Sequence, residues 1–158
     1  MALLRKRGRL VSLNVVGDGP DVARLRKLAA AEGVSESVVF HGRMADEALR
    51  SLYSSCDLFV LPSGGEGFGI VYLEAMAYAR PVIAADAGGA PSVVRPGQSG
   101  WLVPYGDPAA LAESICARLD DPEGSRSVGL QGRRLVESEF SFGTFVDKVR
   151  LLAAAGAS

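Results

Sequence analysis

The sequence predicts an α/β fold, a parallel β-sheet with helices on both of its faces. Short apolar runs of strand-forming residues alternate with segments whose apolar residues recur at helical spacing. Several of these runs end in glycine-rich turns, as expected where parallel strands lead into helices. The 158 residues are 48% hydrophobic, which is enough for one domain with a single core. We therefore expect a Rossmann-like sheet that binds its ligand outside the carboxyl ends of the strands.

The first third of the chain predicts two strands, each followed by a helix. Residues 10–16 predict the first strand, and the helix after its glycine turn ends at Gly33. The apolar face of that helix consists of Val22, Leu25, Leu28 and Ala29. Residues 38–40 predict the second strand and residues 46–55 the second helix. The side chains of this helix that we expect to point inward are Leu49, Leu52 and Tyr53.

The third strand and the helix after it flank a turn with few side chains. Residues 58–61 are apolar and end at Pro62, as a central parallel strand would. The turn 63–69 is rich in glycine, and a helical pattern begins at Ile70. The first backbone N–H groups of this helix have no partner within the helix, and they carry the positive end of its dipole. An anionic ligand in the crevice beyond the strand would face these groups.

The remaining elements continue the alternation. Residues 81–85 predict a strand, and the small-residue loop 86–91 should lie at the same edge as the turn 63–69. Residues 100–103 predict the last strand. Asp107 caps a helix that Pro108 begins, with Leu111, Ile115 and Leu119 on its core side. Two further helices are predicted over about 126–139 and 142–153.

The charge and cysteine content excludes several functional classes. Seventeen basic and eighteen acidic residues give a formal charge of -1, which provides no electrostatic footprint for nucleic acid or for an anionic membrane. Cys56 and Cys116 lack metal-type spacing, and we expect them to be unpaired. No apolar run is long enough to span a membrane, and the N-terminal one is too short for a signal peptide. The expected location is the cytoplasm.

Two carboxylates stand in the strand–turn–helix unit over residues 58–76, Glu66 in the turn and Glu74 inside the helix. Glu66 could simply favour the helix N-terminus, and Glu74 could be a solvated residue near Arg80. Because apolar residues surround Glu74 in the sequence, we expect its helix to be buried on most sides. A charge in that position needs a partner or a function.

Short motifs follow one another along nearly the whole chain. They are Val15 to Pro20, Val39 to Gly42, Glu66 to Gly69, Glu74 to Met76, Arg80 to Ala84, Gly88 to Pro91 and Gly97 to Val103. In this order they resemble the C-terminal, donor-binding domain of the retaining GT-B glycosyltransferases, known as group 1 or family 4. One such motif would be weak evidence, whereas several in the right order make a chance similarity improbable.

The resemblance implies a function for individual residues. Glu66 would face the transferred sugar as the catalytic residue, and Glu74 would bind the ribose of a UDP-, GDP- or ADP-sugar. A carboxylate suits a vicinal diol because it offers two acceptor oxygens to two donors. Other implied donor-binding residues are Gly67, Phe68, Gly69, Gly42, Arg43, Gly17, Gly88 and Gly89. No cofactor and no metal is expected, since helix amides and basic residues would balance the diphosphate charge.

The sequence also departs from the family's pattern. That pattern has a further strand and a loop with an arginine and a lysine before the position of Leu10. Residues 1–158 would therefore be one N-terminally incomplete domain whose sheet lacks its central first strand. Residues 1–9 resemble the end of a helix, so none of Arg5, Lys6, Arg7 and Arg9 is taken as part of the missing pair. The expected partners are the donor, an unidentified acceptor and an N-terminal domain or partner chain, with peripheral membrane association left open.

Other functions fit the sequence to different degrees. A nicotinamide-dinucleotide fold is disfavoured because Val22 stands where the fingerprint's third glycine belongs, and no acid follows the second strand. A serine hydrolase lacks its G-x-S-x-G elbow. A non-catalytic scaffold remnant and a sugar-nucleotide epimerase of the same fold stay open as alternatives. A phosphorylase would need a pyridoxal-linked lysine within the motifs, and none occurs there.

Overall fold

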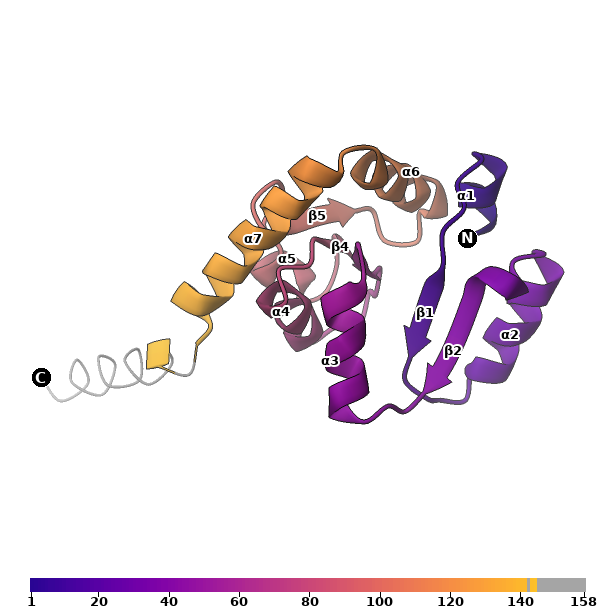
Figure 1. Ribbon diagram of the computed structural model, residues 1–158, viewed down its shortest axis with the longest axis horizontal. Helices are drawn as coiled ribbons and strands as arrows, with labels where there is room; N and C mark the ends of the chain where they lie inside the picture. Colours follow the sequence, from indigo (N-terminus) through magenta and orange to yellow (C-terminus); the bar gives the residue numbers. More distant parts are fainter. Residues whose placement is uncertain (142, 145–158) are drawn as a thin grey trace, which may run out of the picture.

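The chain forms parallel sheets with helices on both faces, which confirms the predicted fold class. The computed structural model describes residues 1–141 and 143–144, and the statements below refer to these residues. Figure 1 shows a smaller sheet of two strands beside a larger part that holds the other three strands. All strand pairs within the sheets are parallel.

The smaller sheet pairs β1 with β2, with Leu13 opposite Val38. The elements of this part are α1 (Ala2–Lys6), β1 (Leu13–Val16), α2 (Val22–Ala31), η1 (Ser35–Ser37) and β2 (Val38–Gly42). The first strand is shorter than the predicted range 10–16, and Leu10 is 95% exposed. Leu28 was expected on the apolar face of α2 but is 49% exposed. Its neighbour Ala29 is the residue of that helix that becomes buried.

The larger sheet has the order β3–β4–β5. Its elements are α3 (Asp46–Ser55), β3 (Phe59–Leu61), α4 (Ile70–Ala77), β4 (Val82–Ala85), α5 (Ala90–Val93), β5 (Gly100–Val103), α6 (Pro108–Asp120) and α7 (Pro122–Glu139). All four residues of β4 are fully buried, as expected for a strand that is paired on both edges and covered on both faces. The core lies on this strand, where Val82 and Ala84 pack with α3, α4 and α5.

Glycines in α7 allow this helix to approach α4 closely. A Cβ atom on Gly129 would lie 2.2 Å from the carbonyl oxygen of Ala79, which is a steric overlap with backbone. A Cβ atom on Gly132 would lie 3.2 Å from the side chain of Met76. Small residues are thus required along this contact with the carboxyl end of α4.

Several predicted boundaries differ from the structure, and one prediction lies largely outside it. The loop predicted over 86–91 ends earlier, because Ala90 already begins α5. The helix predicted over 126–139 begins at Pro122, where the side chain of Asp121 accepts a hydrogen bond from the amide of Gly124. The helix predicted over 142–153 falls almost entirely on residues that are not described.

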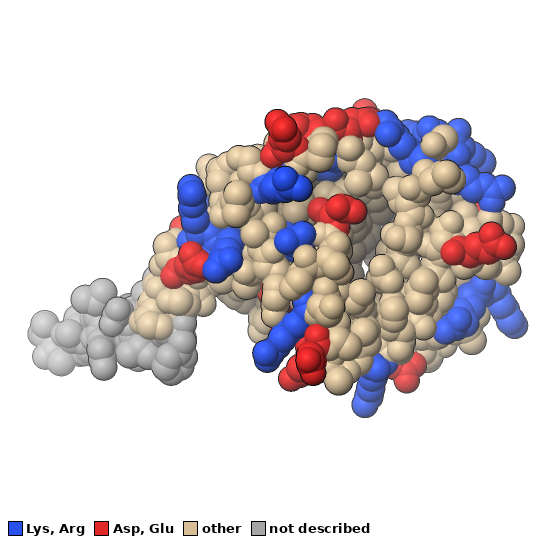
Figure 2. Space-filling model, in the orientation of Figure 1, with Lys and Arg blue, Asp and Glu red and all other residues tan. Residues whose placement is uncertain are grey.

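In the described part of the chain, no strand joins the two sheets. β1 pairs with β2 on one side, and β3 pairs with β4 on one side, so that each has one unpaired edge. This is the division expected if the central strand of the order three-two-one-four-five-six is not among these residues. Figure 2 shows the surface hollowed between the two parts. At one end, α1 packs on α6 and so connects them.

Candidate functional site at the ends of the strands

The turn that follows β3 lies at the carboxyl edge of the larger sheet and leads into α4. Gly69 precedes the helix with a φ of 86°, a left-handed conformation that favours glycine. A Cβ atom there would lie 2.7 Å from the ring of Tyr72, a fully buried residue. The hydroxyl of Tyr72 donates to the carbonyl oxygen of Leu61 at 2.9 Å, which ties α4 to the end of the strand. Burial and the nearby charge of Glu66 raise the pKa of this hydroxyl.

The loop after β4 fixes the shape of this turn. The amide of Gly89 donates to the carbonyl oxygen of Glu66 at 2.7 Å. A Cβ atom on Gly88 would lie 2.8 Å from that oxygen, and one on Gly89 would lie 2.3 Å from the carbonyl oxygen of Gly67. Both glycines were predicted to bind the donor. In the structure their close contacts are to the turn 63–69, so they hold the backbone that would bind it.

On its exposed side, the turn 63–69 leaves backbone atoms accessible. Gly67 and Phe68 are exposed, Glu66 is half-buried, and a Cβ atom on Gly67 would meet nothing within 4 Å. Within the described residues, no side chain caps the N-terminus of α4. Phe68 is 52% exposed and its ring meets Phe140 edge-on, with 6.2 Å between the centroids. The turn therefore offers uncapped backbone amides beside a carboxylate, as an anionic sugar derivative would require.

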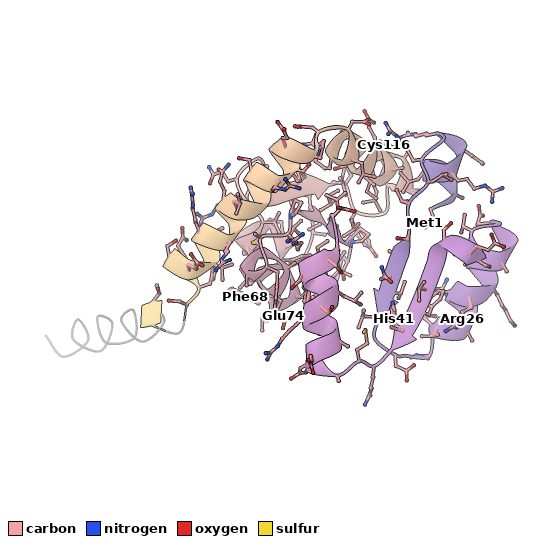
Figure 3. All side chains as sticks on the ribbon, in the orientation of Figure 1. Met1, Arg26, His41, Phe68, Glu74 and Cys116 are labelled. Atoms are coloured by element: carbon pink, nitrogen blue, oxygen red, sulfur yellow. The ribbon has the colours of Figure 1, made fainter. Side chains whose placement is uncertain are left out.

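Glu74 lies on the exposed side of α4, where it faces α3 (Figure 3). One of its oxygens, Oε2, accepts a hydrogen bond from the hydroxyl of Tyr53 at 3.0 Å. The expectation that the helix would be buried around Glu74 was wrong, because only the face with Tyr72, Ala75 and Met76 is buried. Arg80 is not its partner either, since that guanidinium donates to carbonyl oxygens at the ends of α3 and α4.

Gly17, Gly42 and Arg43 lie at the carboxyl ends of the smaller sheet. The amide of Gly17 donates to the carbonyl oxygen of Gly42 at 2.8 Å, and both glycines have positive φ angles. Arg43 is exposed. Figure 3 places nearby His41 on this sheet and Phe68 across the molecule beside α4. The predicted donor residues therefore form two groups, and within the described residues no hydrogen bond joins them.

Two aromatic residues that contact the predicted site residues or the turn were not themselves predicted as part of a site. Tyr53 was expected only as a core residue, yet its hydroxyl donates a hydrogen bond to Glu74. Burial is the main cause that raises the pKa of this hydroxyl, and the hydrogen bond to Glu74 is the second. Tyr105, which is 65% exposed, follows β5, and its ring lies 2.7 Å from where a Cβ atom on Gly64 would be. A tyrosine at an inward helical position, such as Tyr53, is a weak sequence signal for a site, because most such residues simply pack.

The other charged and hollow features lie elsewhere. Arg5 donates to the carbonyl oxygen of Gly33 and Arg9 pairs with Asp120, so both are used in packing α1. Figure 2 shows basic side chains gathered over that helix and both signs of charge interspersed elsewhere on this face. A cavity of about 330 Å³ lies at the amino end of β5. Its lining residues, none of them predicted for the site, are Gln98, Ser99, Gln131, Arg134, Leu135 and Ser138.

Neither a metal cluster nor a membrane span occurs in the described part of the chain. Within ranges 1–141 and 143–144, no three or more side chains of His, Cys, Asp or Glu gather in a way that could hold a metal ion. In the same ranges, none of the helices is both long and apolar enough to cross a membrane. Both cysteines are free, as predicted.

Comparison with known proteins places this geometry in a family. The family model for "Glycosyl transferases group 1" matches residues 1–135. A GDP-mannose-dependent monoacylated alpha-(1-6)-phosphatidylinositol monomannoside mannosyltransferase from Corynebacterium glutamicum is 40% identical over 137 residues, which are 82% of this chain and 35% of that protein. This chain thus spans about a third of that relative's length.

Solved structures agree. HepE from Anabaena, in complex with UDP-glucose, superimposes with a TM-score of 0.83 at 29% identity, over 92% of this chain and 41% of that one. The C-terminal domain of a glycosyl transferase group 1 family protein from Francisella tularensis gives 0.76 at 27% identity, over 88% and 74% respectively. The fold is that of the GT-B glycosyltransferases. The motifs, the arrangement of strands and these matches together show that the chain belongs to the glycosyl transferases group 1 family.

Proposed function

We propose that this chain is the donor-binding part of a retaining glycosyltransferase and binds a nucleoside-diphosphate sugar at the carboxyl ends of its strands. The observation that carries the proposal is the glycine turn after β3. On one side, the amide of Gly89 holds this turn through its hydrogen bond to the carbonyl oxygen of Glu66. On its other side the turn is exposed, and backbone amides lie there beside Glu66 and the start of α4. This arrangement suits a diphosphate, because several N–H groups and a helix dipole point at one anion.

The two carboxylates have different functions in this proposal. Glu66 contacts the sugar that is transferred, whereas Glu74 accepts hydrogen bonds from the ribose hydroxyls. The exposure of Glu74 supports this assignment, since a ligand can reach it without rearrangement of the core. Gly42 and Arg43 would lie near the base, with Gly17 beside them.

The relatives support a nucleotide-sugar donor without fixing which one. The name of the Corynebacterium protein specifies GDP-mannose, and the Anabaena structure holds UDP-glucose. Both ligands share a diphosphate and a ribose, the parts that the turn and Glu74 would bind. The proposal includes no metal, since amides would bear the diphosphate charge, and binding should persist in EDTA. It places the protein in the cytoplasm, where the lipid named for the Corynebacterium relative's acceptor suggests peripheral membrane contact.

Substitution of Glu74 tests the ribose assignment. Glu74→Gln keeps the volume and one acceptor oxygen but removes the charge. We expect nucleotide affinity to fall by about 1 to 3 kcal/mol, with little change in the free energy of unfolding. Titration calorimetry with GDP, UDP and ADP, in the presence of EDTA, measures this. Glu113→Gln, an exposed position on α6, serves as the matched control. Unchanged binding by a more stable Glu74→Gln protein would show that the residue is not a ligand.

We also propose that a separate domain or partner chain holds the acceptor and supplies a strand between β1 and β3. The free edges of these two strands support this, since unpaired N–H and C=O groups on a strand edge accept another strand. Co-expression with the part of the Corynebacterium relative that this chain does not cover provides the test. We expect the two chains to co-purify and to transfer mannose from GDP-mannose, with no transfer by this chain alone. A complex without turnover would instead favour a non-catalytic scaffold.

A further inference from the structure

The contact between Tyr53 and Glu74 joins a core residue to an exposed one. Tyr53 comes from α3 and is 8% exposed, whereas Glu74 comes from α4 and is exposed. The tyrosine hydroxyl and the carboxylate oxygen Oε2 are 3.0 Å apart. Among the described residues, no cation lies within ion-pair distance of this carboxylate. Tyr53 is therefore the side chain that restrains Glu74.

The ring of Tyr53 is itself held firmly. It stacks on Tyr78 with 5.5 Å between the centroids and an interplanar angle of 12°. It also meets Phe59 at 5.8 Å in a tilted arrangement. Phe59 lies in β3, and Tyr78 directly follows α4. The hydroxyl thus has a fixed position set by three elements of the core.

From this geometry we propose that Tyr53 is a positioning residue, which orients the carboxylate of Glu74 for a ribose diol. The inference rests on the proposed function, because it assumes that Glu74 binds the ribose. Each carboxylate oxygen has two acceptor sites, so the bond from Tyr53 occupies one of the four and leaves both oxygens able to accept from the diol. A glutamate that is free to rotate would lose more side-chain entropy on binding than one held in place.

The test compares two ligands on the same protein. The affinities of GDP, UDP and ADP are measured alongside those of their 2′,3′-dideoxy counterparts, and the ratio within each pair reports recognition of the ribose hydroxyls. Tyr53→Phe removes only the hydroxyl and keeps the stacked ring. Because both affinities come from one sample, an unfolded fraction cancels from the ratio. Tyr78→Phe is the matched control, since Tyr78 stacks on the same ring and does not bond to Glu74.

We expect the wild type to prefer the intact ribose and Tyr53→Phe to reduce that preference roughly threefold to tenfold, with Tyr78→Phe close to wild type. Glu74→Gln should abolish most of the preference. An equal loss of both ligands in Tyr53→Phe would show a merely structural effect and overturn the inference. The same holds for an unchanged ratio in Tyr53→Phe when Glu74→Gln loses its preference, a result that leaves the proposed function intact. A wild type that binds none of the six ligands would overturn both.

Discussion

Gly89→Ala is expected to destabilise the protein by about 3 kcal/mol and to weaken binding of a nucleotide sugar more than tenfold. Gly89 has a φ of -80°, which alanine adopts without strain, so the effect should come from contact alone. The new Cβ atom would lie 2.3 Å from the carbonyl oxygen of Gly67. Since that oxygen belongs to backbone, no side-chain rotation can relieve the overlap, and the turn must move. Urea unfolding and calorimetry with UDP-glucose and GDP-mannose measure the two effects.

A second glycine in the turn provides the control for stability. A Cβ atom on Gly65 would meet nothing within 4 Å, and the φ of this residue is not positive. Gly65→Ala should therefore keep the wild-type free energy of unfolding. Equal stability of the Gly89→Ala and Gly65→Ala proteins would show that the contact between the two loops does not hold the turn in shape.

Glu66→Ala is expected to reduce glycosyl transfer by the co-expressed complex roughly 10²- to 10³-fold, the usual loss when one transition-state-stabilising group is removed. It should also weaken the binding of a sugar nucleotide and leave the binding of the bare nucleotide unchanged, because the proposed contact is with the sugar alone. UDP-glucose is compared with UDP, and GDP-mannose with GDP, by calorimetry. Glu66→Gln, which keeps one acceptor oxygen, should lose less affinity for the sugar nucleotides.

One result would contradict the proposal that Glu66 contacts the sugar. Equal losses for UDP and UDP-glucose in Glu66→Ala would mean that Glu66 shapes the turn and does not contact the sugar. Its carbonyl oxygen already accepts the amide of Gly89, so a structural contribution through the backbone exists. Because alanine retains that carbonyl, the substitution separates the side chain from the backbone.

Several elements could be predicted from sequence because their local signals agree. Residues 46–55 were predicted as a helix with the bounds that α3 has, and the helix after the glycine turn begins at Ile70 as expected. Apolar periodicity indicates the first helix, and the glycine that precedes Ile70 marks the start of the second. The cap by Asp107 was predictable for the same reason, and its carboxylate accepts from the amides of Ala109 and Ala110.

Contacts between distant segments could not be predicted in this way. The exposure of Glu74 depends on which face of a uniformly apolar helix meets the sheet, and periodicity carries little information when most positions are apolar. The contact of Gly88 and Gly89 with the turn 63–69 depends on two loops meeting at one sheet edge. Sequence spacing placed both loops at that edge but could not show that Gly88 and Gly89 pack against the backbone of the turn.

The functions that the sequence left open are no longer equally well supported. The family match, together with relatives that are named as glycosyltransferases, favours a glycosyltransferase over an epimerase or a scaffold.

The division of the strands between two sheets has a consequence for binding. β4 lies at the centre of a core, whereas the β1–β2 pair has few buried side chains, so the two parts are expected to open with different free energies. A donor that touches Gly42 on one part and Glu74 on the other would have to hold both in place at once. Its apparent affinity would then fall in proportion to the fraction of molecules in which both parts are ordered. Whatever rigidifies the weaker part would act as an activator without touching the ligand.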